Sequence, residues 1–269
     1  MVFLDSMKNE KNIIGIVPAR MKSTRLPGKA LKDIHGIPML GHVYHRSKMS
    51  SLLIDVYLAI SGEELEEYAT SIGAKWVRDK KDNYRGCSNA IADATLEIEK
   101  KLGKKIDIVV LIQGDEPMIV PEMIDMAVKP LLEDSSIKVV NLMAHIESVE
   151  EHNDPNCPKV VVDRDNFAMY FSREPIPSIK KWSGGEIPRY KQVCVIPFDR
   201  DYLMNFSNLS PGVIEEIESI DMNRVLEHGH KVKMVLENFK TQAVDTLEDL
   251  EKVRELMKGD PLIKKYARD

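Results

Sequence analysis

The strongest constraint on the fold is a nearly continuous apolar run, DIVVLI at residues 107–112, that leads directly into the polar segment QGDEP at 113–117. A strand without polar alternation is typical of the centre of a parallel sheet, where both faces are covered. Residues 107–112 are therefore expected to form a central strand of an α/β fold.

Short β-branched runs and amphipathic stretches alternate through the first half of the chain. Alternation of this kind predicts a doubly wound sheet, whose ligands usually bind beyond the carboxyl ends of the strands. Two polar segments, 18–29 and 113–117, lie at such ends. We expect strands at 13–17, 54–60 and 107–112, and helices at 38–49, 63–72, 90–101 and 121–132.

From about residue 137 the pattern changes to strands at shorter intervals, which we interpret as a β-rich insertion. The glycine-containing stretch 178–188 is expected to be a flexible loop. We expect strands at 138–143, 159–162, 167–171 and 192–196, and helices at 214–227 and 247–257.

Charge and cysteine content narrow the classes of function. The formal net charge of −5 gives no reason to expect nucleic acid as a partner. Cys87, Cys157 and Cys194 lie far apart without a CxxC pair, which fits neither a disulfide framework nor a zinc site. The first residues, MVFLDSMKNEKN, are too acidic and too short in their apolar part to predict a signal peptide, and no apolar run approaches the roughly 20 residues that span a bilayer. We therefore expect a soluble, cytoplasmic protein without a membrane partner.

Residues 18–29 (PARMKSTRLPGK), here called the basic loop, place four cations and two hydroxyls directly after the first strand. Such a loop can neutralise a triphosphate, while backbone N–H groups near Gly28 approach the phosphate oxygens. The pattern is neither a Walker A motif nor GxGxxG, so the signatures of P-loop ATPases and nicotinamide enzymes are missing. By charge alone, a solvated surface loop remains the alternative. The cations are Arg20, Lys22, Arg25 and Lys29.

Two acids are candidates for holding a divalent cation near the basic loop. Asp115 follows the most apolar strand, and Asp245 opens the last helical stretch. Mg²⁺ prefers one or two carboxylates together with phosphate oxygens and water, so this pair predicts a magnesium site. Asp245 has a structural alternative, because it could cap its helix with Glu248 completing a capping box.

Four segments together resemble the 3-deoxy-manno-octulosonate (Kdo) cytidylyltransferases, or CMP-Kdo synthetases. The resemblance covers most of the chain, and the segments come in the same order. It implies a Rossmann-like, doubly wound nucleotidyltransferase fold with a mixed, mostly parallel sheet and a smaller β-rich dimerisation subdomain. It also implies CTP as substrate, Mg²⁺ as cofactor and release of pyrophosphate when an acidic sugar attacks the α-phosphorus. The segments are PARMKSTRLPGK at 18–29, LIQGDEPMI at 111–119, PKVVVDRDNFAMYFSREPIP at 158–177 and VDTLEDLEKVRELM at 244–257.

The resemblance also implies a division of one nucleotidyltransferase domain over residues 1–269. Residues 12–136 would bind the nucleotide, 137–230 would bind the acceptor and dimerise, and 231–269 would return to the main sheet and form the C-terminal helix. The implied catalytic residues are Lys29, Asp115 and Asp245, of which Asp115 and Asp245 hold the metal. The implied nucleotide-binding residues are Pro18, Ala19, Arg20, Ser23, Arg25, Lys29, Arg85 and Gly86. The implied acceptor-binding residues are Gln113, Arg173, Tyr190, Cys194, Asp221 and Met222.

The chain departs from the family pattern where the acceptor and the base should bind. The family's HQSGTER appears as NYRGCSN at 83–89, which leaves the preference for cytosine open. Tyr190 and Cys194 replace a His and a Tyr of the family, and Asp221-Met222 replaces a Glu-Gln pair. Changing the hydrogen-bonding groups of a polyol pocket shifts discrimination by factors of roughly 10⁴ in favourable cases, so we expect an acceptor other than Kdo itself.

Arg173 is kept despite these changes, and a guanidinium is a natural bidentate partner for an acid. A modified ulosonic acid is therefore the first expectation for the acceptor, and a phosphonate or another small anion is the second. A catalytically silent nucleotide-sugar-binding relative and a scaffolding relative are alternatives from other classes. Retention of both Asp115 and Asp245 argues against these two.

Overall fold

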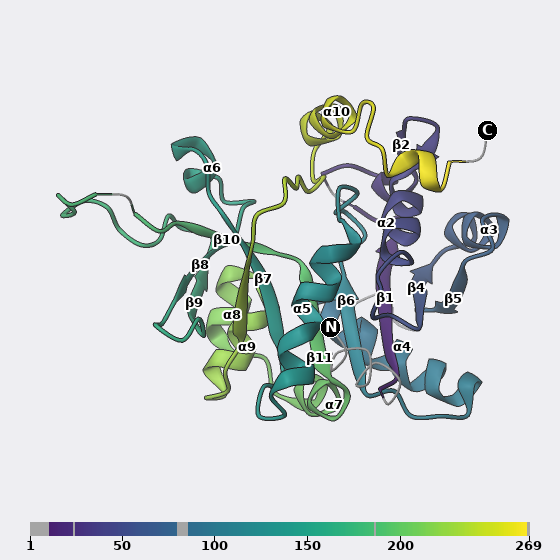
Figure 1. The fold of residues 1–269 in the computed structure, drawn as a ribbon, viewed down its shortest axis with the longest axis horizontal. Helices are drawn as coiled ribbons and strands as arrows, with labels where there is room; N and C mark the ends of the chain where they lie inside the picture. The colour runs from purple at the N-terminus through teal and green to yellow at the C-terminus, as the bar shows by residue number, and fades with distance from the viewer. Residues whose placement is uncertain (1–10, 24, 80–85, 186, 268–269) are drawn as a thin grey trace.

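The computed structural model describes residues 11–23, 25–79, 86–185 and 187–267, and two five-stranded sheets form its framework (Figure 1). The strands of the first sheet are β1 (Ile13–Arg20), β4 (Asp55–Ser61), β5 (Lys75–Arg78), β6 (Ile108–Ile112) and β11 (Val195–Asp199). Their spatial order is β11-β6-β1-β4-β5. β11 is antiparallel to β6, and the other pairs are parallel. The prediction of a mixed, mostly parallel sheet is confirmed.

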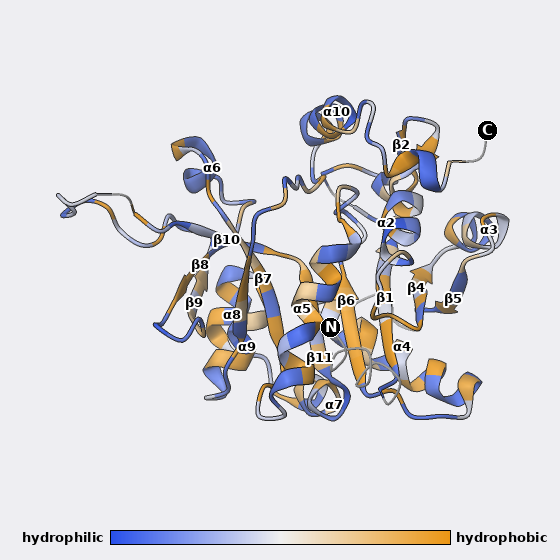
Figure 2. Ribbon diagram, in the orientation of Figure 1, coloured by the Kyte–Doolittle hydropathy of each residue, from blue (hydrophilic) through white to orange (hydrophobic). Residues whose placement is uncertain are grey.

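Helices cover both faces of the first sheet. Alternate residues of β6 enter separate cores, with Val110 in the core of one face and Val109 and Leu111 in the core of the other. Figure 2 shows hydrophobic colour along β6, as the continuous apolar run predicts. The helices α2 (Met39–Ser47), α3 (Glu63–Ser71) and α5 (Pro121–Glu133) pack on one face, and α4 (Cys87–Leu102) and α7 (Arg200–Asn208) pack on the other.

The second sheet contains most of the β-rich part of the chain. Its strands are β7 (Val140–His145), β8 (Lys159–Val162), β9 (Ala168–Ser172), β10 (Tyr190–Val193) and β12 (Lys233–Glu237). Their order is β12-β7-β10-β8-β9, with only the β12–β7 pair parallel. The two sheets meet where Val139 forms a bridge with Phe198 of β11.

Strand pairing differs from the expectation at two places. The strand expected over 192–196 is divided at Cys194, because β10 belongs to the second sheet and β11 to the first. Residues 231–269 were expected to return to the main sheet, but β12 pairs with β7 of the second sheet. Hydrophobic periodicity identifies strands without identifying their partners, which explains both differences.

The helix expected over 214–227 is two helices, α8 (Val213–Glu218) and α9 (Asp221–Glu227). Ser219 between them has a φ of 53°, a left-handed conformation that ends an α-helix. The loop expected over 178–188 projects from the body of the molecule in Figure 1, and its described residues form neither helix nor strand.

The C-terminal helix α10 (Leu247–Leu256) lies close to the expected range of 247–257. It packs above the basic loop through a third apolar core that includes Leu26, Met39 and Val253. No helix in the described part of the chain combines the length and apolarity needed to cross a bilayer. The remaining short elements are η1 (Lys29–Leu31), β2 (Asp33–Ile34), β3 (Ile37–Pro38), α6 (Val149–Asn153) and η2 (Ile263–Lys265).

Candidate active site

A cavity of about 230 Å³ lies at the carboxyl ends of β1 and β6, which are neighbours in the first sheet. Gly114 lets the two following loops approach each other, because a Cβ atom there would meet the Pro18 carbonyl oxygen at 2.9 Å. The structure thus brings together the two polar segments that the sequence places at strand ends. The predicted site residues that line the cavity are Pro18, Ala19, Arg20, Ser23, Lys29, Gln113 and Asp115.

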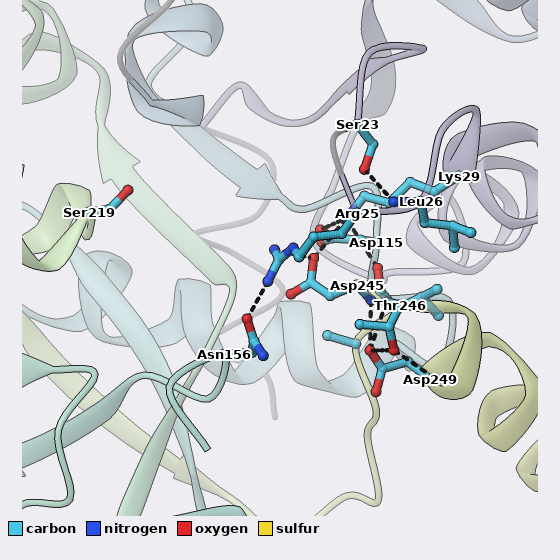
Figure 3. A network of polar contacts seen from close by, with 12 residues as sticks. Ser23, Arg25, Leu26, Lys29, Asp115, Asn156, Ser219, Asp245, Thr246 and Asp249 are labelled. Atoms are coloured by element: carbon cyan, nitrogen blue, oxygen red, sulfur yellow. Dashed lines mark hydrogen bonds and ion pairs between the residues drawn. The ribbon is translucent and has the colours of Figure 1, made fainter. Parts of the chain in front are cut away.

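Lys29 is the centre of the polar network beside this cavity (Figure 3). Its Nζ donates to Asp115 Oδ2 at 2.7 Å and to Asp245 Oδ1 at 3.1 Å, and the Val244 carbonyl oxygen accepts at 3.1 Å. Burial alone would lower the pKa of Lys29, but the two carboxylates outweigh it and the pKa is raised. The ammonium therefore stays charged at neutral pH and holds acids from two distant segments at one point.

Arg25 is a second cation on Asp245, with 2.8 Å between Nη2 and Oδ1. On its other side, the Arg25 guanidinium donates to Asn156 Oδ1, in the turn that precedes β8 (Figure 3). Arg25 thereby joins the basic loop to the part of the chain that forms the second sheet. Sequence reasoning missed Asn156, because no local pattern signals a contact between residues 131 positions apart.

The Asp245 side chain does not cap α10. The N-cap is Thr246, whose hydroxyl accepts from the Asp249 N–H at 3.2 Å, while Asp249 Oδ2 accepts from the Thr246 N–H at 2.9 Å. The alternative in which Asp245 and Glu248 form the capping box is therefore wrong, because the box is formed by the next residue in each case, Thr246 and Asp249. This shift leaves the Asp245 carboxylate directed at the basic loop.

Asp115 and Asp245 are the residues that could hold a divalent cation. Both bind the same Lys29 nitrogen, and Asp115 Oδ1 is buried without a hydrogen-bond partner among the described residues. No set of three or more His, Cys, Asp or Glu side chains in the described chain is arranged to hold a metal. A pair of carboxylates nevertheless suits Mg²⁺, which completes its shell with phosphate oxygens and water.

Of the predicted acceptor residues, Gln113 lies at the cavity and Cys194 next to it, whereas Tyr190 is not among the residues that line the cavity. Gln113 lines the cavity, and its N–H donates to the Cys194 carbonyl oxygen at 3.2 Å. Cys194 therefore lies beside the cavity wall. Tyr190, on β10, packs against His145 with 5.2 Å between the ring centroids.

Met222 and Asp221 are placed differently from the expectation. Met222 has no exposed surface and belongs to the core on the α4 side of the first sheet, so its side chain does not reach the cavity. Asp221 Oδ2 instead accepts a hydrogen bond from the Ser88 N–H at 3.1 Å, at the start of α4. Gly86 is the N-cap of the same helix, and Arg85 lies outside the described residues.

The Arg173 guanidinium joins two segments of the second half of the chain. It donates to the carbonyl oxygens of Glu218 at 2.6 Å, Ser219 at 3.2 Å and Pro155 at 2.8 Å. A guanidinium has five N–H donors, and the described residues accept from three of those of Arg173. Arg173 thus organises the loops between β7 and β8 and between α8 and α9, which the sequence does not predict.

Two further titratable groups near the cavity were not expected from the sequence. Burial, and then the neighbouring Asp115, raises the pKa of Glu116 to about 8. Burial, and then Asp221, raises the pKa of Cys87 to about 12. Cys87 therefore stays a thiol at neutral pH, and because the thiolate is the reactive form it lines the cavity without acting as a nucleophile.

Comparisons with known proteins identify the family of this chain. A cytidylyltransferase family model matches residues 14–234. A 3-deoxy-manno-octulosonate cytidylyltransferase of Pelobacter propionicus is 38% identical over 253 residues, covering 91% of this chain and 96% of that protein. Its counterpart in Geotalea uraniireducens is 38% identical over 255 residues, covering 91% and 99%.

Solved structures extend the comparison. The structure of CMP:2-keto-3-deoxy-manno-octonic acid synthetase complexed with CTP superimposes with a TM-score of 0.84 at 31% identity, covering 93% of this chain and all of that one. A 4-diphosphocytidyl-2C-methyl-D-erythritol synthase of Anaerococcus prevotii, with a TM-score of 0.63 at 15% identity, shares the fold alone.

These matches define the class of protein, a nucleotidyltransferase. The extent of the sequence match narrows this class to one family. The chain belongs to the cytidylyltransferase family.

Proposed function

We propose that this protein transfers CMP from CTP to an acidic sugar of the 3-deoxy-ulosonic type and releases pyrophosphate. The observation that carries the proposal is the Lys29 ammonium held between Asp115 and Asp245 at the mouth of a cavity lined by the basic loop. The match to relatives named Kdo cytidylyltransferases supports the same reaction.

The basic loop supplies positive charge where the triphosphate would bind. Arg20 and Lys29 line the cavity, and Arg25 lies next to it on Asp245. Nucleotidyl transfer along an in-line path needs positioning and charge neutralisation more than proton transfer, so fixed cations of this kind lower the barrier. Lys29 is suited to neutralise charge on the α-phosphate, because two carboxylates already orient its ammonium.

Mg²⁺ is part of the proposal, with Asp115 and Asp245 as its protein ligands. The buried Asp115 Oδ1, which has no partner among the described residues, supports this assignment because a buried lone oxygen is costly without a partner. When bound, the ion would neutralise phosphate charge and fix the geometry of the nucleotide. Lys29 would then exchange part of its contact with the carboxylates for contact with phosphate oxygens.

The acceptor class follows from the relatives' names and from the free donors of Arg173. Among the described residues, two N–H groups of its guanidinium have no acceptor and would bind the carboxylate of an ulosonic acid. Tyr190 and Cys194 stand where the family has His and Tyr, which supports an acceptor that differs from Kdo in its hydroxyl pattern. A phosphonate acceptor is the second candidate, since it would use the same donors.

A substrate panel tests the proposal. The protein is incubated with CTP, UTP, ATP or GTP, with Mg²⁺, and with Kdo, a modified ulosonic acid or a phosphonate, while pyrophosphate release is followed. We expect release with CTP and an ulosonic acid, with a CMP ester as product by mass spectrometry. Release with UTP, ATP or GTP but not with CTP would contradict the cytidylyl assignment. No release with any combination of nucleotide and acceptor would favour a catalytically silent relative.

The proposal includes a homodimer and a cytoplasmic location. Large apolar side chains are exposed near the second sheet, where Ile217 and Val213 of α8 are 72% and 69% exposed and Met169 of β9 is 64% exposed. A second copy that covers this surface would explain their exposure. Light scattering should give twice the mass of one chain, and Ile217→Lys should lower the measured mass towards that of a single chain.

The proposed cytoplasmic location is supported by the three unpaired cysteines, which suit a reducing compartment.

A further inference from the structure

The N-terminus of α4 is capped by a residue from a distant part of the chain. Its N-cap is Gly86, which has no side chain, and its first turn contains no acidic residue. Asp221 Oδ2 accepts from the Ser88 N–H at 3.1 Å across 133 residues of sequence. A carboxylate in this position pairs an N–H that the helix leaves free and is favoured by the helix dipole.

Gly86 is required by this contact rather than by its backbone conformation. Its φ of −167° and ψ of 166° are extended values that any residue adopts. A Cβ atom at Gly86 would lie 2.1 Å from Asp221 Oδ1 and 2.5 Å from Asp221 Cγ, which is closer than real atoms approach. The glycine therefore makes room for the carboxylate.

A second contact ties α9 to the first turn of α4. Arg224 Nη1 donates to Asn89 Oδ1 at 3.0 Å, and its Nε donates to Glu215 at 2.7 Å. Arg224 is 1% exposed, so this ion pair is shielded from solvent. Asp221 and Arg224 are three residues apart on α9 and thus lie on one face of the helix. α9 is therefore fixed to α4 through two charged side chains.

The other side of the α8–α9 pair is fixed to the second sheet. Asn223 Nδ2 donates to the Phe171 carbonyl oxygen at 3.0 Å, and the Phe171 N–H donates back to Asn223 Oδ1 at 3.3 Å. Glu218 accepts from the Ser172 hydroxyl at 2.7 Å and from the Arg173 N–H at 2.7 Å. The second sheet is in this way connected through α9 to the start of α4, whose first residue is a wall of the cavity.

We propose that Asp221 is a positioning residue that fixes the start of α4 relative to the acceptor side of the site, and that Gly86 is present to admit its carboxylate. The predicted effect on turnover rests on the proposed function, whereas the Asp221–Gly86 contact does not. Asp221 then acts through α4 and the Cys87 wall instead of touching the acceptor.

A double-mutant cycle of Gly86→Ala and Asp221→Ala tests this directly. We expect Gly86→Ala to lower kcat/KM by about 10-fold to 100-fold, because displacement of catalytic groups by about 1 Å has effects of up to this size. In the Asp221→Ala background the same substitution should cost less than about twofold, since the clashing carboxylate is gone. Gly185→Ala is the matched control, because a Cβ atom there meets nothing within 4 Å.

Asp221→Asn separates positioning from simple folding damage. Its amide oxygen still accepts from the Ser88 N–H, so kcat/KM should stay within about threefold of wild type while Asp221→Ala loses more. Asp221→Ala should lower kcat with little change in the KM for the acceptor. A rise confined to the acceptor KM would mean that Asp221 touches the acceptor, and it would overturn the proposal.

A measurement of CTP affinity makes the test independent of the acceptor. Calorimetry is carried out on the four proteins of the cycle, which are wild type, Gly86→Ala, Asp221→Ala and the double variant. If no acceptor gives turnover, a loss of CTP affinity in Gly86→Ala that Asp221→Ala relieves still supports the contact, and only the proposed reaction fails. Equal losses from Gly86→Ala in both backgrounds, in affinity or turnover, would show that Gly86 serves a substrate, and would overturn the inference.

Discussion

Lys29 shows how one side chain can hold together acids from two distant parts of the fold. It belongs to the loop after β1, Asp115 follows β6, and Asp245 precedes α10. Two carboxylates this close repel each other, so the ammonium lowers the cost of keeping both charged. In the proposed function the same ammonium binds phosphate, and the basic loop serves as the anion site.

Loss of loop cations should weaken nucleotide binding without unfolding the protein. Arg20→Ala and Lys29→Ala should each reduce CTP affinity by about 1.5–3 kcal/mol, the usual scale for a hydrogen bond to a charged group. Calorimetry measures the affinity, and Lys32→Ala, which removes an exposed cation outside the cavity lining, is the control. Unchanged affinity in both loop variants would mean that the loop does not bind the triphosphate.

Met222 was expected to contact the acceptor, but the structure places it in an apolar core. The side chain is fully buried among apolar neighbours, so Met222→Gln would place an amide in that core. We expect the free energy of unfolding to fall by about 1–3 kcal/mol, the cost of burying an unpaired amide. Urea unfolding measures this, with Met222→Leu as the volume-conserving control. A stable Met222→Gln that improves turnover of Kdo would place this residue in the acceptor pocket after all.

At the scale of elements, the C-terminal segment secures α2 through a buried polar network. Arg46 Nε donates to the Tyr266 hydroxyl at 2.9 Å, and that hydroxyl lies 2.7 Å from His42 Nδ1. His42 Nε2 is 2.7 Å from the Ile34 carbonyl oxygen, so Nε2 carries the proton in the neutral ring and Nδ1 accepts. Burial, opposed by the bond to Ile34, lowers the pKa of His42 to about 4.

This network predicts a loss of stability in mild acid. The unfolded chain protonates His42 near its ordinary pKa of 6.5, whereas the folded chain does so near 4. Between these values the unfolded state binds more protons, so stability falls as the pH decreases, by at most about 3 kcal/mol. Wild type should lose stability relative to His42→Gln as pH falls from 6.5 to 4, measured by urea unfolding. Parallel curves for the two proteins would contradict this account of His42.

Elements with strong local patterns were predictable from the sequence. β6 and α5 lie within one residue of the expected ranges, because their apolar residues alone specify a buried strand and an amphipathic helix. The division at Cys194 and the break at Ser219 were not predictable, since pairing partners and a left-handed residue leave no periodic signal.

The site residues also differ in whether a local sequence pattern predicts them. Contiguous motifs located the basic loop, Asp115 and Asp245. The contacts of Asn156 with Arg25 and of Asp221 with Ser88 join residues 131 and 133 positions apart, and only the fold reveals them.

The whole molecule consists of two sheets that meet at the bridge between Val139 and Phe198, with the cavity at the ends of the central strands of the first. Arg25 and Asn156 join the basic loop to the second half of the chain on one side, and Asp221 and Ser88 join α9 to α4 on another. Both apolar cores of the first sheet also include residues of the second sheet, such as Leu142 and Met143, so these polar contacts add to a continuous apolar packing between the two sheets.

In the proposed function, CMP transfer depends on a divalent cation that Asp115 and Asp245 hold. The most direct test is the rate of pyrophosphate release from CTP and an ulosonic acid as Mg²⁺ is titrated into wild type, Asp115→Asn, Asp245→Asn and the control Glu248→Gln, an exposed neighbour of Asp245. We expect wild type and Glu248→Gln to saturate with Mg²⁺, and each Asp variant to lose at least about 100-fold in rate while keeping its unfolding midpoint. Mg²⁺-dependent turnover at the wild-type rate in either Asp variant would contradict the account.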